Sequence, residues 1–304
     1  MNKFEITILG CGCALPTLKH NASAQIVNIH EKCFLIDCGE GTQLELRRRN
    51  IHLNRIFCIF LTHLHGDHCF GLPGLISTLG LLGRTAPMHI YGPEDTESVF
   101  KPILDYFCPR NPYEIIFHPV NTKISQIIYE DHTLTVSSIP LKHRIRCCGY
   151  LFREKEKPRH LLREAIDKYQ IPTYTFGNIK AGKDIVLPNG EIITNEKLTT
   201  PPDPIRSYAY CSDTMFLPSN ANLLQKVDIL YHEATFAEED KDLSKKTFHS
   251  TAKEAALLAQ EAHVNKLVIG HLSSRYKDEE MLLKQAKEIF QNTILANEGM
   301  CIKL

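Results

Sequence analysis

Four histidine and aspartate side chains lie close together in the first quarter of the sequence. Residues 62–68 read Thr-His-Leu-His-Gly-Asp-His, which places His63, His65, Asp67 and His68 within six positions. With 15 histidines in 304 residues, chance alone would seldom produce such a cluster. Imidazole and carboxylate are ligand types that suit Zn²⁺. The alternating His63 and His65 can face one way from an extended segment, and the two residues after Gly66 can face another, so we infer two neighbouring metal positions.

Four side chains cannot complete two metal sites, so further ligands must come from other parts of the chain. Three candidates each follow an apolar run that has the character of a strand. They are His143 after residues 134–139, Asp213 after residues 206–211 and His271 after residues 267–269. Taken alone, each residue is more often a surface or capping residue. Beside the cluster, the interpretation as metal ligands is favoured.

Strands and helices that alternate along the chain are expected to position these residues. Runs rich in β-branched and aromatic residues predict strands at 4–9, 24–29, 33–37, 56–61, 88–91, 114–117, 134–139, 206–211, 229–233 and 267–269. Helix formers and helical spacing predict helices at 41–49, from 71 onward, and at 95–107, 251–263 and 279–290. The first three strands, separated by short turns, predict an antiparallel meander.

Composition indicates a folded protein with mostly reduced cysteines. The 35 basic residues balance the 35 acidic ones, and 43% of residues are hydrophobic. No apolar stretch reaches the roughly 20 residues that a transmembrane helix needs, and the N-terminal apolar run is interrupted too early for a signal peptide. Eleven cysteines without a C-x-x-C pair do not suggest a disulfide framework. We therefore expect a cytoplasmic protein that does not associate with membranes.

The region after Tyr150 differs from the rest of the chain. Between residues 142 and 183 there are eleven basic and four acidic residues, a net charge of +7. Residues 153–204 show little continuous apolar periodicity, with a polar helix predicted at 160–169 and a hairpin at 187–193 around Pro188-Asn189-Gly190. The charge alone fits either a solvated surface or a nucleic-acid contact. We expect one domain over 1–304, from which residues 153–204 extend as an inserted arm.

Longer motifs resemble those of a known family. The sequence His63-Leu-His-Gly-Asp67-His68, with the spacing to the three later ligands, resembles the metallo-β-lactamase superfamily over the whole chain, and more narrowly the ribonuclease Z family. The motifs that carry the narrower resemblance are Leu-Gly-Cys-Gly near the start, Asp37-Cys-Gly-Glu-Gly-Thr-Gln43, Phe70-Gly-Leu-Pro-Gly-Leu75, Ser212-Asp-Thr214, His232-Glu-Ala-Thr235 and His249-Ser-Thr251.

The resemblance implies an α/β fold, the αβ/βα four-layer sandwich, with a protruding arm and two Zn²⁺ ions per chain. The implied ligands are His63, His65 and His143 for one ion, Asp67, His68 and His271 for the other, and Asp213 between them. It further implies a zinc-dependent endoribonuclease that removes the 3′ trailer from transfer RNA precursors. Two adjacent metals would activate water and neutralise the charge that develops on the phosphodiester.

The resemblance also implies roles in proton transfer. His249 is the candidate proton donor to the leaving 3′ oxygen, because a carboxylate such as Glu233 raises the pKa of an imidazole. Asp67 is a candidate acceptor of the nucleophile's proton. The alternative for His249 is a structural residue beside the helix caps Ser250 and Thr251.

Contacts with RNA are expected from two segments. Residues 171–182 resemble the family's Gly/Pro-rich arm motif without its leading Gly-Pro pairs, and Lys180 and Lys183 are candidates to pair with phosphates. Residues Pro16 to Asn21 stand in place of the family's PxKxRN motif, which is associated with cleavage position relative to the CCA end. There Lys19 is shifted by one position and His20 replaces arginine, so Lys19 and Asn21 are the candidate contacts.

Three other functions share parts of this pattern. A hydrolase of small phosphodiesters, sulfate esters or lactones would use the same ligands but would not need a basic arm. A redox protein with a di-iron centre usually carries an acidic residue where this chain has His65. A non-enzymatic RNA-binding descendant would not need all seven ligand positions filled. The resemblance also suggests a homodimer.

Overall fold

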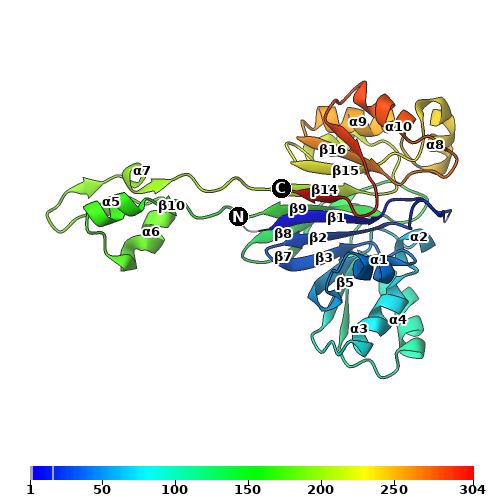
Figure 1. Ribbon diagram of the computed structural model, residues 1–304, viewed down its shortest axis with the longest axis horizontal. Helices are drawn as coiled ribbons and strands as arrows, with labels where there is room; N and C mark the ends of the chain where they lie inside the picture. The colour runs from blue at the N-terminus through cyan, green and yellow to red at the C-terminus, as the bar shows by residue number, and fades with distance from the viewer. Residues whose placement is uncertain (1–2, 16) are drawn as a thin grey trace. The chain divides into compact units, whose positions relative to one another are not determined.

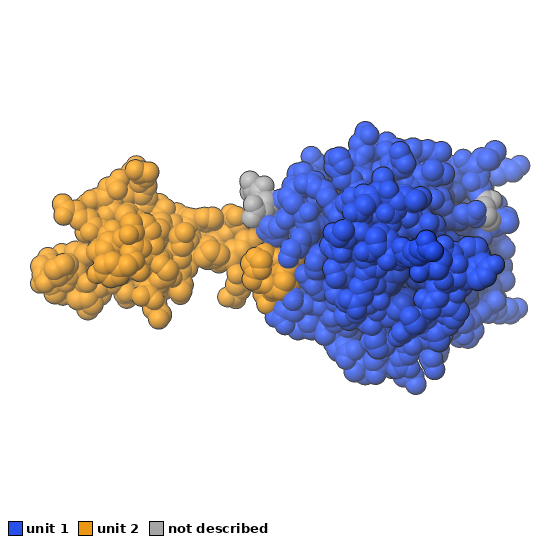
Figure 2. Space-filling view, turned by 90° about the horizontal axis from the view of Figure 1, so that it is seen from below, with its two compact units in different colours: residues 1–130, 135–152, 207–304 blue, residues 131–134, 153–206 orange. Residues whose placement is uncertain are grey.

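The computed structural model describes residues 3–15 and 17–304, and the chain divides into two compact units. Unit 1 comprises residues 1–130, 135–152 and 207–304, and unit 2 comprises residues 131–134 and 153–206 (Figure 2). Pro16, the first residue of the loop that replaces the PxKxRN motif, lies outside the described residues.

The first sheet of unit 1 has seven strands in the order β18-β1-β2-β3-β4-β5-β6. Their bounds are β1 Phe4–Gly10, β2 Ala24–Ile29, β3 Lys32–Ile36, β4 Ile56–Phe60, β5 Met88–Pro93, β6 Ile115–Val120 and β18 Cys301–Lys303. Strands β1, β2 and β3 pair antiparallel, as the short turns predict. From β3 to β6 the pairing is parallel.

The second sheet also has seven strands, in the order β17-β16-β15-β14-β9-β8-β7. Their bounds are β7 Ile127–Glu130, β8 Leu134–Pro140, β9 Cys148–Glu154, β14 Ser207–Cys211, β15 Ile229–Glu233, β16 Lys266–Gly270 and β17 Thr293–Leu295. Strands β14 to β17 are parallel. The carboxyl ends of β14, β15 and β16 therefore lie at one edge of this sheet.

Helices cover the outer face of each sheet (Figure 1). In unit 1 they are α1 Thr42–Arg48, α2 Gly66–Cys69, α3 Leu72–Leu81, α4 Thr96–Phe107, α8 Lys241–Thr247, α9 Ala252–Glu261 and α10 Glu280–Lys287, with short 3₁₀ helices η1 Leu53–Arg55, η3 Pro218–Asn222 and η4 Glu238–Asp240. Apolar side chains of α1, α3 and α4 pack on the first sheet, and those of α9 and α10 pack on the second. This is the four-layer αβ/βα sandwich that the resemblance implies.

Aromatic side chains fill the space between the two sheets. The ring of Phe34 on β3 lies 5.6 Å from that of Phe152 on β9, and the ring of Phe60 on β4 lies 5.1 Å from that of Tyr150 on β9. The hydroxyl of Tyr208 donates to Gln25 on the opposite sheet. Because these large side chains are buried, they fix the two sheets together and hold the ends of β4 and β14 in place.

Unit 2 forms a small fold of its own. It contains β10 His160–Leu161, α5 Arg163–Lys168, η2 Thr173–Thr175, α6 Phe176–Lys180, β11 Ile185–Val186, β12 Ile192–Ile193, α7 Asn195–Leu198 and β13 Thr199–Thr200. The hairpin near residues 187–193 is confirmed, with β11 paired to β12. The helix predicted at 160–169 is wrong in its first part, since His160 and Leu161 pair with β13.

The segment has an apolar core of its own, although its sequence shows little continuous apolar periodicity. Ile171, Ile179, Ile185, Ile193 and Leu198 form a buried cluster within unit 2. Their spacing follows no single helix or strand, because each comes from a different short element or turn. A periodicity search therefore cannot find this core.

None of the helices formed by the described residues combines the length and apolar character that crossing a bilayer requires. All eleven cysteines, each among the described residues, are free thiols.

Candidate metal centre

The loop after β4 carries the candidate metal-binding cluster, and a close backbone contact fixes its shape. The amide of Cys38 donates to the carbonyl of His68 at 2.7 Å, and the amide of Gly71 donates to the carbonyl of Cys38 at 2.8 Å. A Cβ atom at Gly71 would lie 2.1 Å from the carbonyl oxygen of Gly39. Only glycine permits this approach, which explains the glycine in the sequence Phe70-Gly-Leu-Pro-Gly.

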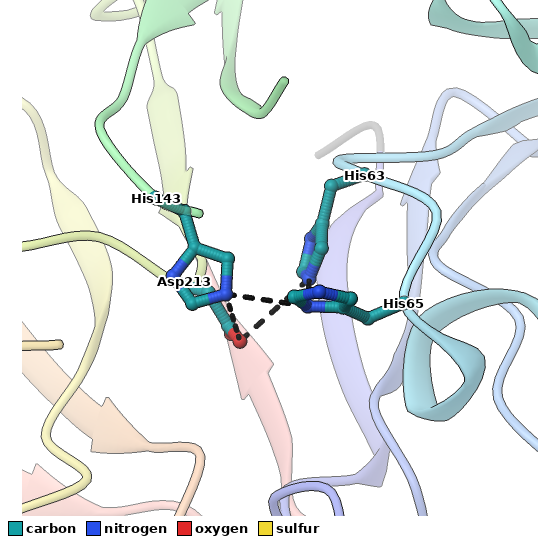
Figure 3. Close-up of side chains that lie close together, drawn as sticks. All are labelled: His63, His65, His143 and Asp213. Atoms are coloured by element: carbon teal, nitrogen blue, oxygen red, sulfur yellow. Dashed lines mark hydrogen bonds and ion pairs between the residues drawn. The ribbon is translucent and has the colours of Figure 1, made fainter. Parts of the chain in front are cut away.

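One group of candidate ligands consists of His63, His65, His143 and Asp213, whose side chains converge from three segments of chain (Figure 3). His65 Nδ1 lies 3.1 Å from His63 Nε2 and 3.2 Å from His143 Nε2. Asp213 Oδ2 lies 3.7 Å from His63 Nε2 and 3.8 Å from His143 Nε2. Three ring nitrogens and one carboxylate oxygen thus surround one point, as tetrahedral zinc ligands do.

A second group consists of Asp67, His68 and His271. Asp67 Oδ2 lies 3.4 Å from His68 Nε2 and 3.5 Å from His271 Nε2. All three atoms are buried and find no hydrogen-bond partner among the described residues. Buried polar atoms without partners are costly, so their convergence indicates a place for a cation.

Asp213 joins the two groups. Its Oδ2 faces the first group, whereas its Oδ1 lies 3.4 Å from His68 Nε2 and 3.1 Å from His271 Nε2. One carboxylate therefore offers an oxygen to each group, which is the position of a bridging ligand.

Hydrogen bonds to the other ring nitrogen set the tautomers of His63 and His68 in the loop after β4. The Thr62 hydroxyl donates to Asp37, so it accepts from His63 Nδ1 at 3.0 Å. His68 Nδ1 donates to Asp37 Oδ2 at 2.8 Å. Both Nε2 atoms are therefore left with lone pairs directed at the shared points, as metal ligands require.

The ligands from the second sheet are oriented in the same way. His143 Nδ1 donates to the carbonyl of Phe248 at 3.0 Å, and His271 Nδ1 donates to the Thr235 hydroxyl at 2.9 Å. Phe248 and His271 have φ angles of 61° and 57°, in the left-handed region that costs energy for residues with a Cβ. Two residues in this backbone conformation thus lie at the ligands from the second sheet.

The local charges also favour cations. Burial lowers the pKa of His68, but the carboxylates of Asp213, Asp37 and Asp67 outweigh it and raise the pKa well above its ordinary value. Burial raises the pKa of Asp213, but the surrounding histidines, His271 first, hold it well below its ordinary value. The carboxylates of Asp67 and Asp213, whose pKa values are both lowered, therefore favour compensating positive charge, which two divalent ions would supply.

Beside the ligands lies a buried pair formed by Glu233 and His249. His249 Nδ1 donates to Glu233 Oε1 at 2.8 Å, and the amide of Thr214 donates to the same oxygen at 3.0 Å. Burial lowers the pKa of His249, but the charge of Glu233 and their hydrogen bond outweigh this effect, so the pKa is raised. Thr251 caps α9 as expected, with its side chain accepting from the amide of Glu254. His249 therefore precedes a helix cap and is also held by a carboxylate.

A cavity of about 620 Å³ opens over both groups. Its walls include the ligands His65, Asp67 and His271 together with His249. Phe70, which is 71% exposed, and Arg144 also line it. An aromatic ring and a guanidinium beside the ligands suit a nucleotide and its phosphate.

The four candidate RNA contacts lie outside this cavity. Lys19 is exposed and pairs with Glu279, and the Asn21 side chain donates to the carbonyl of Leu9 at 3.3 Å. Lys180 and Lys183 are exposed residues of unit 2.

Sequence reasoning missed the residues that orient the ligands. Asp37, Thr62 and Thr235 fall inside or beside the motifs, but no role was predicted for them. Their position in the sequence could have indicated this role, because Asp37 lies one residue and Thr62 two residues after the end of a strand.

The two sheets, the His and Asp side chains that follow their strands and the position of Asp213 between the two groups are those of a hydrolase of the metallo-β-lactamase fold. Comparison with solved structures agrees. The metallo-β-lactamase fold protein YhfI of Bacillus subtilis superposes with a TM-score of 0.70 at 17% identity over 100% of both chains. The short form of human tRNase Z superposes with a TM-score of 0.72 at 27% identity over 98% of both chains.

Sequence relatives define the family more narrowly. Ribonuclease Z of Bacteroides fragilis strain ATCC 25285 is 54% identical over 304 residues, and that of Porphyromonas gingivalis strain W83 is 52% identical, in each case over 100% of both chains. The chain belongs to the ribonuclease Z family. A family model described as Anti-Pycsar protein Apyc1 also matches residues 4–104, within the first sheet and its helices.

Proposed function

We propose that this protein is the endoribonuclease that removes the 3′ trailer from transfer RNA precursors. The product would be a transfer RNA with a 3′-hydroxyl and a trailer with a 5′-phosphate. The observation that carries this proposal is full-length identity of 54% to a ribonuclease Z, combined with seven His and Asp side chains that converge on two adjacent points.

The residues fit two Zn²⁺ ions. His63, His65 and His143 would hold one, Asp67, His68 and His271 the other, and Asp213 would contribute an oxygen to each. Bound there, the ions would lower the pKa of the attacking water and neutralise charge on the phosphodiester oxygens. The ligand atoms are imidazole nitrogens and carboxylate oxygens, a set that suits zinc. In four of the histidines the second ring nitrogen is already engaged in a hydrogen bond.

The chain's own residues complete the reaction. Water attacks phosphorus, the bond from phosphorus to the 3′ oxygen breaks, and that oxygen needs a proton. His249 would donate it, because Glu233 holds the Nδ1 proton and leaves Nε2 for the substrate side. Asp67, on the cavity wall, would accept the proton from the nucleophile. Arg144 and Phe70 would position the phosphate and a neighbouring base.

Unit 2 would bind the transfer RNA through its phosphates. It contributes Lys180, Lys183 and the basic residues between 153 and 168, and none of the proposed metal ligands. Such contacts raise affinity without adding to the chemical step. We further propose Lys19 and Asn21 as contacts near the cleavage site, a homodimer as the active form, and a cytoplasmic location.

The test is to incubate the purified protein with a 3′-extended transfer RNA precursor and to map both new ends. A 3′-hydroxyl on the transfer RNA and a 5′-phosphate on the trailer would support the proposal, and a His68→Ala variant serves as the control. Intact precursor under conditions in which the protein hydrolyses a small phosphodiester would refute it.

A further inference from the structure

A second cluster of metal-binding side chains lies apart from the seven ligands described above. It consists of Cys11 just after β1, His20 in the following loop and Glu298 before β18. Cys11 Sγ lies 3.4 Å from His20 Nδ1 and 3.6 Å from Glu298 Oε1. His20 Nδ1 lies 2.8 Å from Glu298 Oε2. Cys11 and His20 are buried, and Glu298 is nearly so.

We propose that Cys11, His20 and Glu298 bind a third Zn²⁺ ion. Tetrahedral zinc with its usual bond lengths separates a thiolate from an imidazole or carboxylate ligand by about 3.5 Å. Both distances from Cys11 Sγ match this spacing. The shorter distance between His20 and Glu298 is that of a hydrogen bond, and it opens by about 0.5 Å when the metal replaces the proton between them.

The atoms around the cluster are arranged as a metal site requires. His20 Nε2 lies 3.0 Å from Glu279 Oε1, so a carboxylate holds the ring nitrogen opposite the ion. Glu298 Oε1 accepts from the amide of Asn21 at 2.9 Å. The carbonyl oxygen of Ala296 lies 3.5 Å from Cys11 Sγ and is positioned as a fourth ligand.

The charge balance permits the exchange of protons for metal. Without an ion, Lys19 and His20 face the carboxylates of Glu279 and Glu298, and the hydrogen bond to Glu298 raises the pKa of His20. Zn²⁺ would displace two protons, one from the Cys11 thiol and one from His20 Nδ1, and leave the net charge unchanged. Burial and then Glu298 raise the pKa of Cys11, so binding should weaken steeply as pH falls.

The ion would stabilise one wall of the catalytic cavity. The carbonyl of Cys11 accepts from the amide of Leu272, the residue after His271, at 2.9 Å. The amide of Gly12 donates to the carbonyl of Asn21 at 3.0 Å, and Cys13 and Ala14 line the cavity. The proposed site thus joins the ends of β1 and β18 to the loop that borders the substrate.

Substitution with Co²⁺ tests the proposal, because only a thiolate ligand gives cobalt an intense near-ultraviolet charge-transfer band. The two groups of the catalytic centre are built from described His and Asp residues and contain no cysteine. We expect the full-length protein saturated with Co²⁺ to show this band and to bind three metal ions per chain. Binding should also release two protons at this site.

Variants assign the band. Cys11→Ser should abolish it and lower the metal content to two, whereas Cys301→Ser, at an exposed cysteine, should retain it. Glu298→Gln keeps the thiol and should weaken cobalt binding at least tenfold. This variant tests the site if Cys11→Ser does not fold. Absence of the band in the saturated wild type, or its persistence in Cys11→Ser, would overturn the proposal.

Discussion

Replacing Glu233 by glutamine should change how the reaction depends on pH. Glu233 is fully buried, and its Oε1 lies 2.8 Å from His249 Nδ1. A charged hydrogen bond of this kind contributes about 1.5–3 kcal/mol. Its loss should lower the pKa of His249 and, at 1.36 kcal/mol for each tenfold change, weaken proton donation roughly 10- to 100-fold where the ring becomes deprotonated.

The sign follows from the role of His249 as an acid. Its pKa is raised in the folded protein, so the proton is present below that pKa and is lost as pH rises through it. In Glu233→Gln, His249 should lose its proton at a lower pH than in the wild type. Cleavage should therefore slow roughly 10- to 100-fold on the alkaline side and much less on the acidic side.

Single-turnover cleavage of a precursor across the pH range, with metal content measured in parallel, gives the comparison. Glu254→Gln is the matched control, because Glu254 is a buried glutamate that caps α9 and makes no contact with His249 among the described residues. An unchanged profile in Glu233→Gln would refute the reasoning. Loss of zinc in that variant would assign Glu233 to the metal site.

Three further predictions follow from the site and from unit 2. His249→Ala should slow cleavage roughly 10²- to 10⁴-fold at pH values below the pKa of His249, where the wild-type ring carries the proton, with metal content intact; a wild-type single-turnover rate there would exclude it as the proton donor. His68→Ala should lose at least one zinc by metal analysis together with activity, since its Nε2 faces both Asp67 and Asp213; full activity would contradict the ligand assignment. Replacing residues 158–203 with a short Gly/Ser linker should weaken precursor binding and its salt dependence but retain any hydrolysis of bis(p-nitrophenyl) phosphate; unchanged affinity in a filter-binding assay would remove unit 2 from recognition. This deletion retains Glu154, which forms an ion pair with Arg206.

The sequence predicted strands better than the short elements between them. Runs such as 24–29 and 229–233 match β2 and β15 at both ends, because buried strands are rich in apolar and β-branched side chains. Strand β7 was missed: its residues are only partly buried, so it lacks the strong pattern of a central strand. The short elements of unit 2 were harder still, since contacts distant in sequence determine them.

The ligands could be proposed from sequence because His and Asp at strand ends carry their own chemistry. The partners that orient them could not, because a threonine hydroxyl has no distinctive signal until the fold brings it to a ring nitrogen. Thr235, for example, lies 36 positions from His271 in sequence. Motif resemblance located the segment, but only the three-dimensional arrangement gives the residue its role.

The Asp37 carboxylate has a consequence for how the enzyme acquires its metals. One oxygen accepts from Thr62, which orients His63 in the first group, and the other accepts from His68 in the second. An ion at either position would further order the histidine that this carboxylate orients, and through the shared carboxylate it would favour binding of the second ion. We therefore expect cooperative loading, in which chains holding a single ion are scarce and partially metallated preparations are mixtures of empty and full molecules.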